Sequence, residues 1–348
     1  DWSSDVCFSD LTSLTKKLRD FSAKYVKISD VDKTRTGTLV NDYIENQIIE
    51  FCRQKSELQI LNLQYTASFY ERLKTEAADE VDIMVVLGTP SSEIEVIASE
   101  VPGYVRLRAK GDPIFCKYLG HEGYLDPRSF RDGWFRSIVQ RAVNNIKPKG
   151  PFSDVRLVVR THGPAVQVDI FRKGSKEKLL SVDLVPCFHV KDSWYVPKPF
   201  KGKRFVFNHK VFWRQSFSLE EKQVLENMDQ EDHGCRHELL RIVKTVVKRQ
   251  VTSLPLDSYY LKTAFMHYIE RHSQDWVSKD ALGKHFLGYL GEVLLYLESG
   301  NLPRYSLPDV NLLNDFNEVA VKQMANRLKR ILNSEVRLQK ILVRMNKD

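Results

Sequence analysis

The apolar positions of this chain change their spacing near residue 58 and again near residue 188. Between these points, short apolar runs bounded by turn residues predict β-strands. The expected strands are residues 59–63, 81–87, 94–98, 105–109, 155–159, 166–171 and 178–185. One helix, beginning near Asp126 and reaching Val143, interrupts them. This order of elements indicates an α+β lobe with a mixed or antiparallel sheet.

Helical spacing dominates on both sides of this region. Two helices are expected before it, at residues 11–25 and 38–53, with a polar, exposed segment at 27–37 between them. Residues 189–210 are rich in Pro and Lys and are expected to cross to a second lobe. The helices expected after this crossing are residues 219–227, 237–249, 258–272, 279–297 and 315–346.

Composition narrows the classes of partner. A chain of 348 residues with 42% hydrophobic residues can bury the cores of two lobes. Its net charge of +8 favours a polyanionic partner or phosphorylated substrates. Five widely separated cysteines indicate no disulfide framework, so we expect a reducing, cytoplasmic setting. No apolar run of about 18 residues predicts a membrane span, and no signal-peptide pattern is seen at the N-terminus.

Two carboxylates mark the first candidate site. Glu80 and Asp82 are two residues apart on an expected strand, so both side chains point to one face. A solvated acidic edge strand would explain this pair, but a divalent ion would also stabilise it. Upstream, Ser68 follows the small Ala67 in a turn that leaves room for a phosphate. A third carboxylate could come from Asp169 or Asp183, and spacing alone leaves that choice open.

Seven short runs then follow one another in an order that is similar to a known family. They are residues 66–71 (TASFYE), 80–82 (EVD), 181–184 (SVDL), 213–218 (WRQSFS), 237–244 (HELLRIVK), 258–265 (SYYLKTAF) and 302–308 (LPRYSLP). Together they resemble the nucleotidyltransferase core of cyclic GMP-AMP synthase and the wider male-abnormal-21 (Mab-21) family. The resemblance implies a bilobal nucleotidyltransferase fold of class α+β, with a mixed-sheet N-terminal lobe, a long spine helix and a helical C-terminal lobe. The implied divisions are N-terminal helices including the spine helix (1–57), a catalytic lobe (58–210) and a helical Mab-21 lobe (211–348).

The resemblance also implies the residues of the active site. It selects Asp183 as the third acid, so Glu80, Asp82 and Asp183 would be catalytic and would hold two Mg²⁺ or Mn²⁺ ions. The implied nucleotide-binding residues serve the phosphates (Ser68, Lys244, Ser258), the bases (Arg214, Ser216, Ser218) and base stacking (Tyr259). Ala67 departs from the glycine usual in this family's phosphate turn. Zinc is not expected, because His233, Cys235 and His237 offer too few ligands for a tetrahedral site.

The implied function is a nucleic-acid-activated synthase of a cyclic dinucleotide similar to cyclic GMP-AMP, made from ATP and GTP. It would serve innate immune sensing through a downstream cyclic-dinucleotide receptor. Without a zinc module, double-stranded RNA is favoured over DNA as activator, because A-form duplexes are recognised by shape and backbone. Eight basic residues are expected to form the activator surface: Lys16, Lys17, Lys24, Lys147, Lys149, Lys201, Lys203 and Arg204.

Two alternatives remain open at this stage. One is a catalytically silent Mab-21-like scaffold or binding protein, against which the complete acidic triad argues. The other is a template-free enzyme that adds nucleotides to RNA ends, which would use the same three acids.

Overall fold

The computed structural model describes residues 11–66, 73, 75, 78–88, 94–110, 113–148, 150–198, 200, 209–232, 234–250 and 256–343. The chain divides into two compact units. The sheet unit comprises Ser29–Glu71 and Ala77–Lys222, and the helical unit comprises Asp1–Ile28, Arg72–Glu76 and Gln223–Asp348. A mixed sheet with covering helices in one unit and helices in the other confirms the expected α+β class.

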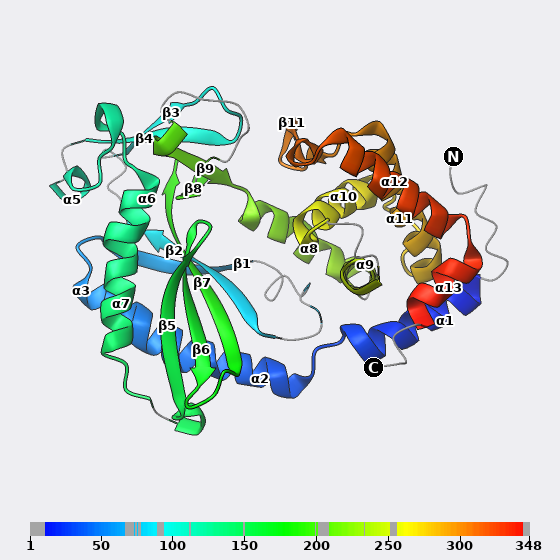
Figure 1. Ribbon diagram of the computed structural model, residues 1–348, viewed down its shortest axis with the longest axis horizontal. Coiled ribbons are helices and arrows are strands. Elements are labelled where there is room, and N and C mark those ends of the chain that lie inside the picture. The colour runs from blue at the N-terminus through cyan, green and yellow to red at the C-terminus, as the bar shows by residue number, and fades with distance from the viewer. Residues whose placement is uncertain are drawn as a thin grey trace. The chain divides into compact units, whose positions relative to one another are not determined.

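The sheet unit is built on a nine-stranded mixed sheet (Figure 1). Its strands are β1 (Ile60–Thr66), β2 (Glu80–Leu87), β3 (Ile94–Ala98), β4 (Tyr104–Ala109), β5 (Val155–His162), β6 (Ala165–Arg172), β7 (Lys178–Val190), β8 (Ser193–Val196) and β9 (Phe212–Ser216). The order is β1-β2-β7-β8-β9-β4-β3, and the hairpin β5–β6 joins it through β6, which pairs with β7. Among the described strand pairs, β2 with β7 is parallel and the others are antiparallel.

Helices cover one face of this sheet. The odd-numbered positions of β2, such as Val81 and Ile83, share a core with Val182 and Leu184 of β7 and with the helices. Because side chains alternate along a strand, the even-numbered positions of β2 point to the other face. The helices that contribute to this core are α2 (Asp30–Leu39), η3 (Val40–Ile49) and α3 (Glu50–Lys55), then α5 (Pro113–Cys116), η5 (Phe130–Phe135) and α7 (Arg136–Asn144). The short α6 (Pro127–Ser129) leads directly into η5.

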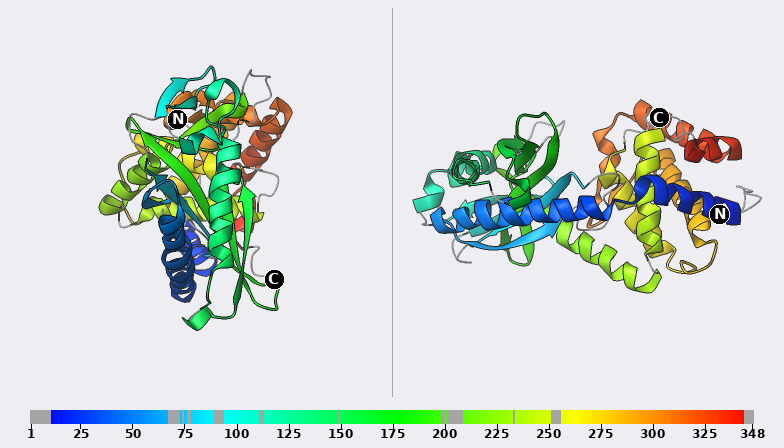
Figure 2. Two further views of the ribbon diagram at one scale, coloured as in Figure 1. Left: turned by 90° about the vertical axis from the view of Figure 1, so that its left-hand side faces the viewer. Right: turned by 90° about the horizontal axis from the view of Figure 1, so that it is seen from below.

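The first of these helices is longer than expected. It runs without a break from Asp30 to Lys55 (Figure 2), so residues 30–37, expected as a polar segment between two helices, are helical. Most of these residues are exposed, as expected. Ser29 caps the helix by accepting a 3.0 Å hydrogen bond from the Asp32 amide. Ion pairs of Lys33 with Asp30 and of Arg35 with Asp32 support its polar first turns.

The segment expected to cross between lobes also differs. β7 continues to Val190, β8 follows it, and β9 adds a further strand, so the sheet unit ends at Lys222. These strands escaped prediction because β8 and β9 have four and five residues, which is too short for a clear alternation. At the other end, residues 1–28 belong to the helical unit.

The helical unit has its own core. Its elements are α1 (Leu11–Phe21), η2 (Ser22–Val26), α9 (Cys235–Gln250), α10 (Ser258–Arg271), α11 (Ala281–Ser299), β10 (Pro303–Arg304), β11 (Leu307–Asn311), η8 (Leu312–Asp315), α12 (Glu318–Leu332) and α13 (Glu335–Val343), with the latter part of α8 (Ser218–Asp232). α1 packs closely on α11, where the Gly283 amide donates to Thr15 Oγ1 at 3.0 Å. A Cβ at Gly283 would lie 2.7 Å from that oxygen, so this contact requires glycine. The single helix expected at 315–346 is wrong, because the chain breaks at Asn333 and Ser334 and Ser334 caps α13.

Among the described residues, no helix has both the length and the apolar character needed to cross a bilayer.

A buried histidine makes the helical unit sensitive to acid. His285 is 3% exposed, its ring stacks on Trp276 at 3.7 Å, and the Tyr268 hydroxyl lies 2.9 Å from its Nδ1. Burial, aided by the charge of Lys284, lowers the pKa of His285 to about 4. In the unfolded chain its pKa is about 6.5, so between these values the unfolded state binds more protons. Stability is therefore lost as the pH falls through this window.

We expect the melting temperature to fall between pH 7 and pH 5, and to fall less in His285→Leu than in the wild type. His121→Leu, which changes a largely exposed histidine, is the matched control and should keep the wild-type pH dependence. Parallel pH profiles for the wild type and His285→Leu would contradict this account.

Candidate active site on the sheet face

Strand register places the three expected acids on one face of the sheet. In the parallel pair β2–β7, Glu80 lies opposite Ser181 and Asp82 lies opposite Asp183. Paired residues of neighbouring strands are about 4.8 Å apart and point to the same face. All three acids therefore share the sheet face opposite the helices. Glu80 is exposed, Asp82 is half-buried and Asp183 is 5% exposed.

Asp183 is held by two neighbours on the β5–β6 hairpin. Gln167 Nε2 donates to its Oδ1 at 2.9 Å, and His162 Nδ1 lies 3.1 Å from its Oδ2. Burial raises the pKa of Asp183, the two hydrogen bonds act against this rise, and the charge of Glu80 adds to it. The carboxylate thus sits where its negative charge is costly without a nearby cation.

Asp169, the other candidate for the third acid, is occupied by structural contacts. The Ser181 hydroxyl donates to its Oδ1 at 2.6 Å. Arg160 Nε lies 3.4 Å from Oδ2, and Lys178 Nζ lies 4.0 Å from Oδ1. A carboxylate that is already paired with cations has less to offer a metal, so these contacts favour Asp183 as the ligand.

The acids suit a hard divalent cation, because Mg²⁺ prefers carboxylate oxygens together with water and phosphate. Within the described part of the chain, no three His, Cys, Asp or Glu side chains lie close enough to hold an ion. The acids are therefore aligned by their backbones, and the side chains of Glu80 and Asp82 would have to turn toward the Asp183 carboxylate to share a metal.

Two expected base-binding residues lie on the same sheet face. On β9, Arg214 pairs with Val196 and Ser216 pairs with Trp194 of β8. Val196 belongs to a small apolar cluster on this face, which is completed by Met84, Val86, Ala165, Val185 and Cys187. The Ser216 and Ser218 hydroxyls are 2.7 Å apart. One face thus carries acids on β2 and β7 and polar groups on β9. The apolar cluster forms the apolar floor of this face.

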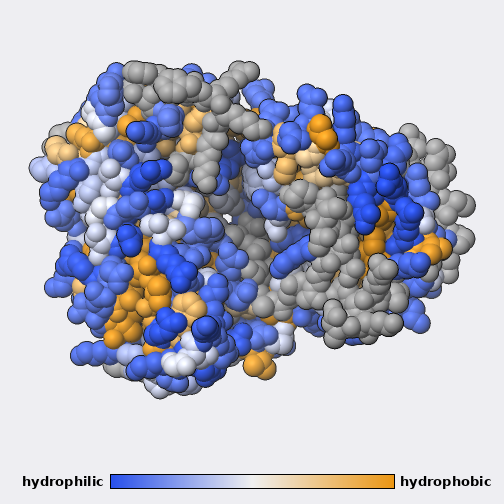
Figure 3. Space-filling view, in the orientation of Figure 1, coloured by the Kyte–Doolittle hydropathy of each residue, from blue (hydrophilic) through white to orange (hydrophobic). Residues whose placement is uncertain are grey.

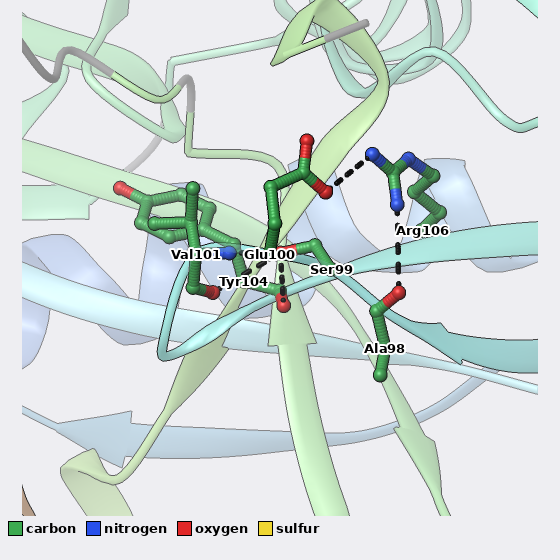
Figure 4. Close-up of polar contacts among 6 residues, drawn as sticks. All are labelled: Ala98, Ser99, Glu100, Val101, Tyr104 and Arg106. Atoms are coloured by element: carbon green, nitrogen blue, oxygen red, sulfur yellow. Dashed lines mark hydrogen bonds and ion pairs between the residues drawn. The ribbon is translucent and has the colours of Figure 1, made fainter. Parts of the chain in front are cut away.

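The turn between β3 and β4 supports the polar end of this face (Figure 4). Ser99 Oγ donates to the carbonyl oxygens of Val101 and Tyr104, at 3.0 and 2.8 Å. Arg106 donates to Glu100 at 2.7 Å. The amide of Glu100 itself and the contact with Arg106 lower the pKa of Glu100. Because Tyr104 pairs with Arg214, this turn fixes the strand beside Arg214.

The remaining expected nucleotide-binding residues belong to the helical unit or lie outside the described residues. Lys244 Nζ donates to the Leu73 carbonyl at 2.8 Å. Ser258 is exposed at the first turn of α10, and the hydroxyl of the half-buried Tyr259 accepts from Arg304 Nε at 2.9 Å. Ser68 lies outside the described residues.

Sequence reasoning missed several polar residues near the acids. Gln167 and His162 contact Asp183, and Lys222 Nζ donates to the Tyr65 carbonyl at 3.0 Å, at the end of β1. A single Gln, His or Lys on a strand or helix carries no periodic signal. Only the strand register could identify the contacts of Gln167 and His162, and only the packing of α8 could identify that of Lys222.

The expected activator residues are only partly described. Lys16 is exposed and Lys17 half-buried on α1, and Lys24 Nζ lies 5.0 Å from the centre of the Tyr25 ring; these three are in the helical unit. Lys147 is exposed in the sheet unit. The residues outside the described part of the chain are Lys149, Lys201, Lys203 and Arg204.

A second basic surface on the helical unit was not expected. A groove of about 480 Å³ lies where α12 meets α13. Its lining residues are Asn326, Lys329, Arg330, Asn333, Ser334 and Arg337. Strongly hydrophilic residues gather over α12 (Figure 3), although Lys329 is paired with Glu298 at 2.8 Å.

The residues considered for zinc are only partly described. Cys235 is half-buried and His237 is buried, while His233 lies outside the described residues. Burial raises the pKa of Cys235 to about 12, which keeps the thiol protonated at neutral pH.

Comparison with known proteins supports the same interpretation. Residues 69–227 match the Mab-21 protein nucleotidyltransferase domain, and residues 235–330 match the Mab-21 protein HhH/H2TH-like domain. The chain is 63% identical to cyclic GMP-AMP synthase-like receptor 3 of Stylophora pistillata, over 96% of this chain and 99% of that protein. It is 26% identical to a cyclic GMP-AMP synthase-like receptor of Ctenocephalides felis, over 92% of this chain and 83% of that protein. A receptor of the same name from Tribolium castaneum is 24% identical, over 89% of this chain and 86% of that protein. The chain therefore belongs to the cyclic GMP-AMP synthase-like receptors, a family of Mab-21 nucleotidyltransferases that synthesise cyclic dinucleotides.

Proposed function

We propose that this nucleotidyltransferase joins ATP and GTP into a cyclic dinucleotide similar to cyclic GMP-AMP when double-stranded RNA binds to it. The observation that carries the proposal is the alignment of Glu80, Asp82 and Asp183 on one sheet face by the β2–β7 register. The name of the Stylophora pistillata relative supports a product of this class.

In this proposal the three acids hold two Mg²⁺ or Mn²⁺ ions. The bound ions would supply charge stabilisation for the attacking hydroxyl and for the departing pyrophosphate. The chain itself orients the reactants. Asp183 provides a fixed carboxylate, because Gln167 and His162 hold both of its oxygens. Arg214 and Ser216 would face the base from β9, above the apolar floor of Met84 and Val185.

Ser68, Lys244, Ser258 and Tyr259 complete the proposed nucleotide contacts. An ammonium, a hydroxyl and an aromatic ring are the groups that phosphates and bases bind in other nucleotide sites.

The first prediction separates the two aspartates. Asp183→Asn should lower nucleotide transfer about 1,000-fold, the effect of losing several kcal/mol of metal-mediated stabilisation. The melting temperature of Asp183→Asn should not fall, because the substitution removes a buried negative charge whose desolvation is costly. The measurement is chromatographic analysis of products from ATP, GTP and Mg²⁺ with duplex RNA.

Asp169→Asn is the matched control. It keeps an acceptor for the Ser181 hydroxyl, so we expect most of the activity to remain and the free energy of unfolding to fall by about 1 kcal/mol. Full activity of Asp183→Asn would refute the assignment of the third acid. Lengthened RNA in place of a small cyclic product would replace the proposed reaction with nucleotide addition, and no product from the wild type under any activator would favour a silent scaffold.

The second prediction concerns the activator. Duplex RNA should stimulate the product more than duplex DNA, and simultaneous reversal of Lys16, Lys17 and Lys24 to Glu should weaken RNA binding. Each lost phosphate contact should reduce the slope of log affinity against log salt by a value on the order of 0.9, the B-form figure. Fluorescence anisotropy at several salt concentrations measures this slope.

Reversal of Lys173, Lys176 and Lys191, which are exposed in the sheet unit, applies the same change in net charge. Equal losses of RNA binding for the two triple variants would show that only net charge matters and would exclude a local surface at α1. A third variant, Arg330→Glu with Arg337→Glu, tests the groove between α12 and α13.

A further inference from the structure

The hairpin β5–β6 ends directly beside the proposed metal ligands. We propose that Gln167 and His162 are positioning residues, which hold the Asp183 carboxylate in the orientation that binds the metal ions. This inference rests on the proposed function, because it takes Asp183 to be a metal ligand.

Gln167 is placed by the strands themselves. It lies directly opposite Asp183 in the antiparallel pair β6–β7, and its Nε2 donates to Oδ1 at 2.9 Å. Its side chain is half-buried, so fewer rotamers are open to it than on a free surface. The hydrogen bond therefore restricts rotation of the carboxylate.

His162 holds the second oxygen of the same carboxylate. Its Nδ1 lies 3.1 Å from Oδ2, although the side chain is 66% exposed. An ionised carboxylate has about four acceptor positions. One donor on each oxygen fixes the plane of the group and leaves the other positions for metal ions. Partners that orient a metal ligand in this way are a regular part of metal sites.

The end of the hairpin is itself anchored. His162 pairs with Ala165 across a tight turn, in which Gly163 has a φ of 55°. Arg131 of η5, a buried residue, donates to the Gly163 carbonyl and forms two hydrogen bonds with Asp132, at 2.7 and 2.9 Å. A helix thus fixes the turn that carries His162, which explains how an exposed histidine can hold a defined position.

The two contacts also hold Asp183 in one orientation before any ion binds, because each of them occupies a different carboxylate oxygen. Without these donors, the carboxylate would have to be reoriented each time an ion binds. The loss should therefore appear in metal affinity.

The experiment measures Mn²⁺ binding by electron paramagnetic resonance, in the presence of a non-hydrolysable ATP analogue. Gln167→Met, which keeps the size of the side chain and removes the donor, should weaken Mn²⁺ binding about 10- to 100-fold, as the loss of an orienting partner usually does. Gln140→Met is the matched control, since Gln140 also donates to a side-chain oxygen at 3.0 Å but lies on α7. Its Mn²⁺ affinity should equal that of the wild type.

A double-mutant cycle separates positioning from general destabilisation. In the Asp183→Asn background, Gln167→Met should cause no further loss of Mn²⁺ binding, because both changes disable the same ligand. If the role of Gln167 were merely structural, Gln167→Met would still lower the melting temperature in the Asp183→Asn background. His162→Phe should weaken Mn²⁺ binding less than Gln167→Met, and His121→Phe, which alters an exposed His–Glu pair at 3.5 Å, should not weaken it.

The outcomes distinguish the two levels of the proposal. If Asp183→Asn binds Mn²⁺ as well as the wild type, the metal assignment of the proposed function fails. If Asp183→Asn weakens binding but Gln167→Met does not, or if the two losses are fully additive, the positioning role is overturned while the proposed function stands.

Discussion

The parallel pairing of β2 with β7 is the constraint on which the sheet unit depends. All the other strand pairs described here are antiparallel, and this one places Asp82 level with Asp183. The same register directs Val81, Ile83, Val182 and Leu184 into the core under the helices. A shift of the strand register by one residue would expose these apolar side chains and bury the acids. Packing of the core therefore also fixes the positions of the acids on the opposite face.

The sheet face that carries the acids contains carboxylates whose burial would lower stability if they had no partners. Asp183 is nearly buried and lies beside Glu80, an arrangement that raises its pKa. Asp169 lies on β6, which pairs with β7. Its carboxylate is instead bound by Ser181, Arg160 and Lys178. Two aspartates of similar burial therefore differ in their partners: Asp169 contacts two cationic side chains and a hydroxyl, and Asp183 contacts Gln167 and His162. This difference is what makes Asp183 the better candidate for a metal ligand.

The two units use polar contacts for different purposes. In the helical unit, close approach of α1 to α11 at Gly283 and the stacked pair of His285 with Trp276 stabilise a core. In the sheet unit, the turn at Ser99, the hairpin end at Gly163 and the cap at Ser29 hold strands and helix in register. The contacts of the sheet unit hold the strands in place, and these strands carry the polar groups of the proposed chemistry.

The class of fold, most of the strands and helices, and the family could be predicted from the amino-acid sequence alone. Apolar spacing is a local property, and seven runs in fixed order are hard to produce without common ancestry. It also indicated Glu80 and Asp82 as a pair, because residues two apart on a strand must share a face. Short elements gave weaker signals: β8 and β9 were missed, and the polar start of α2 looked like a loop although Ser29 caps it.

Which residues contact one another could be learned only from the folded chain. Periodicity shows that a face is apolar but not which face it packs against, so the grouping of residues 1–28 with the helical unit could not be predicted. The contacts of Gln167 and His162 with Asp183 depend on the register of β6 with β7 and on a turn anchored by Arg131. Register is set by burial summed over whole strands, and for this physical reason no local pattern in the sequence contains it.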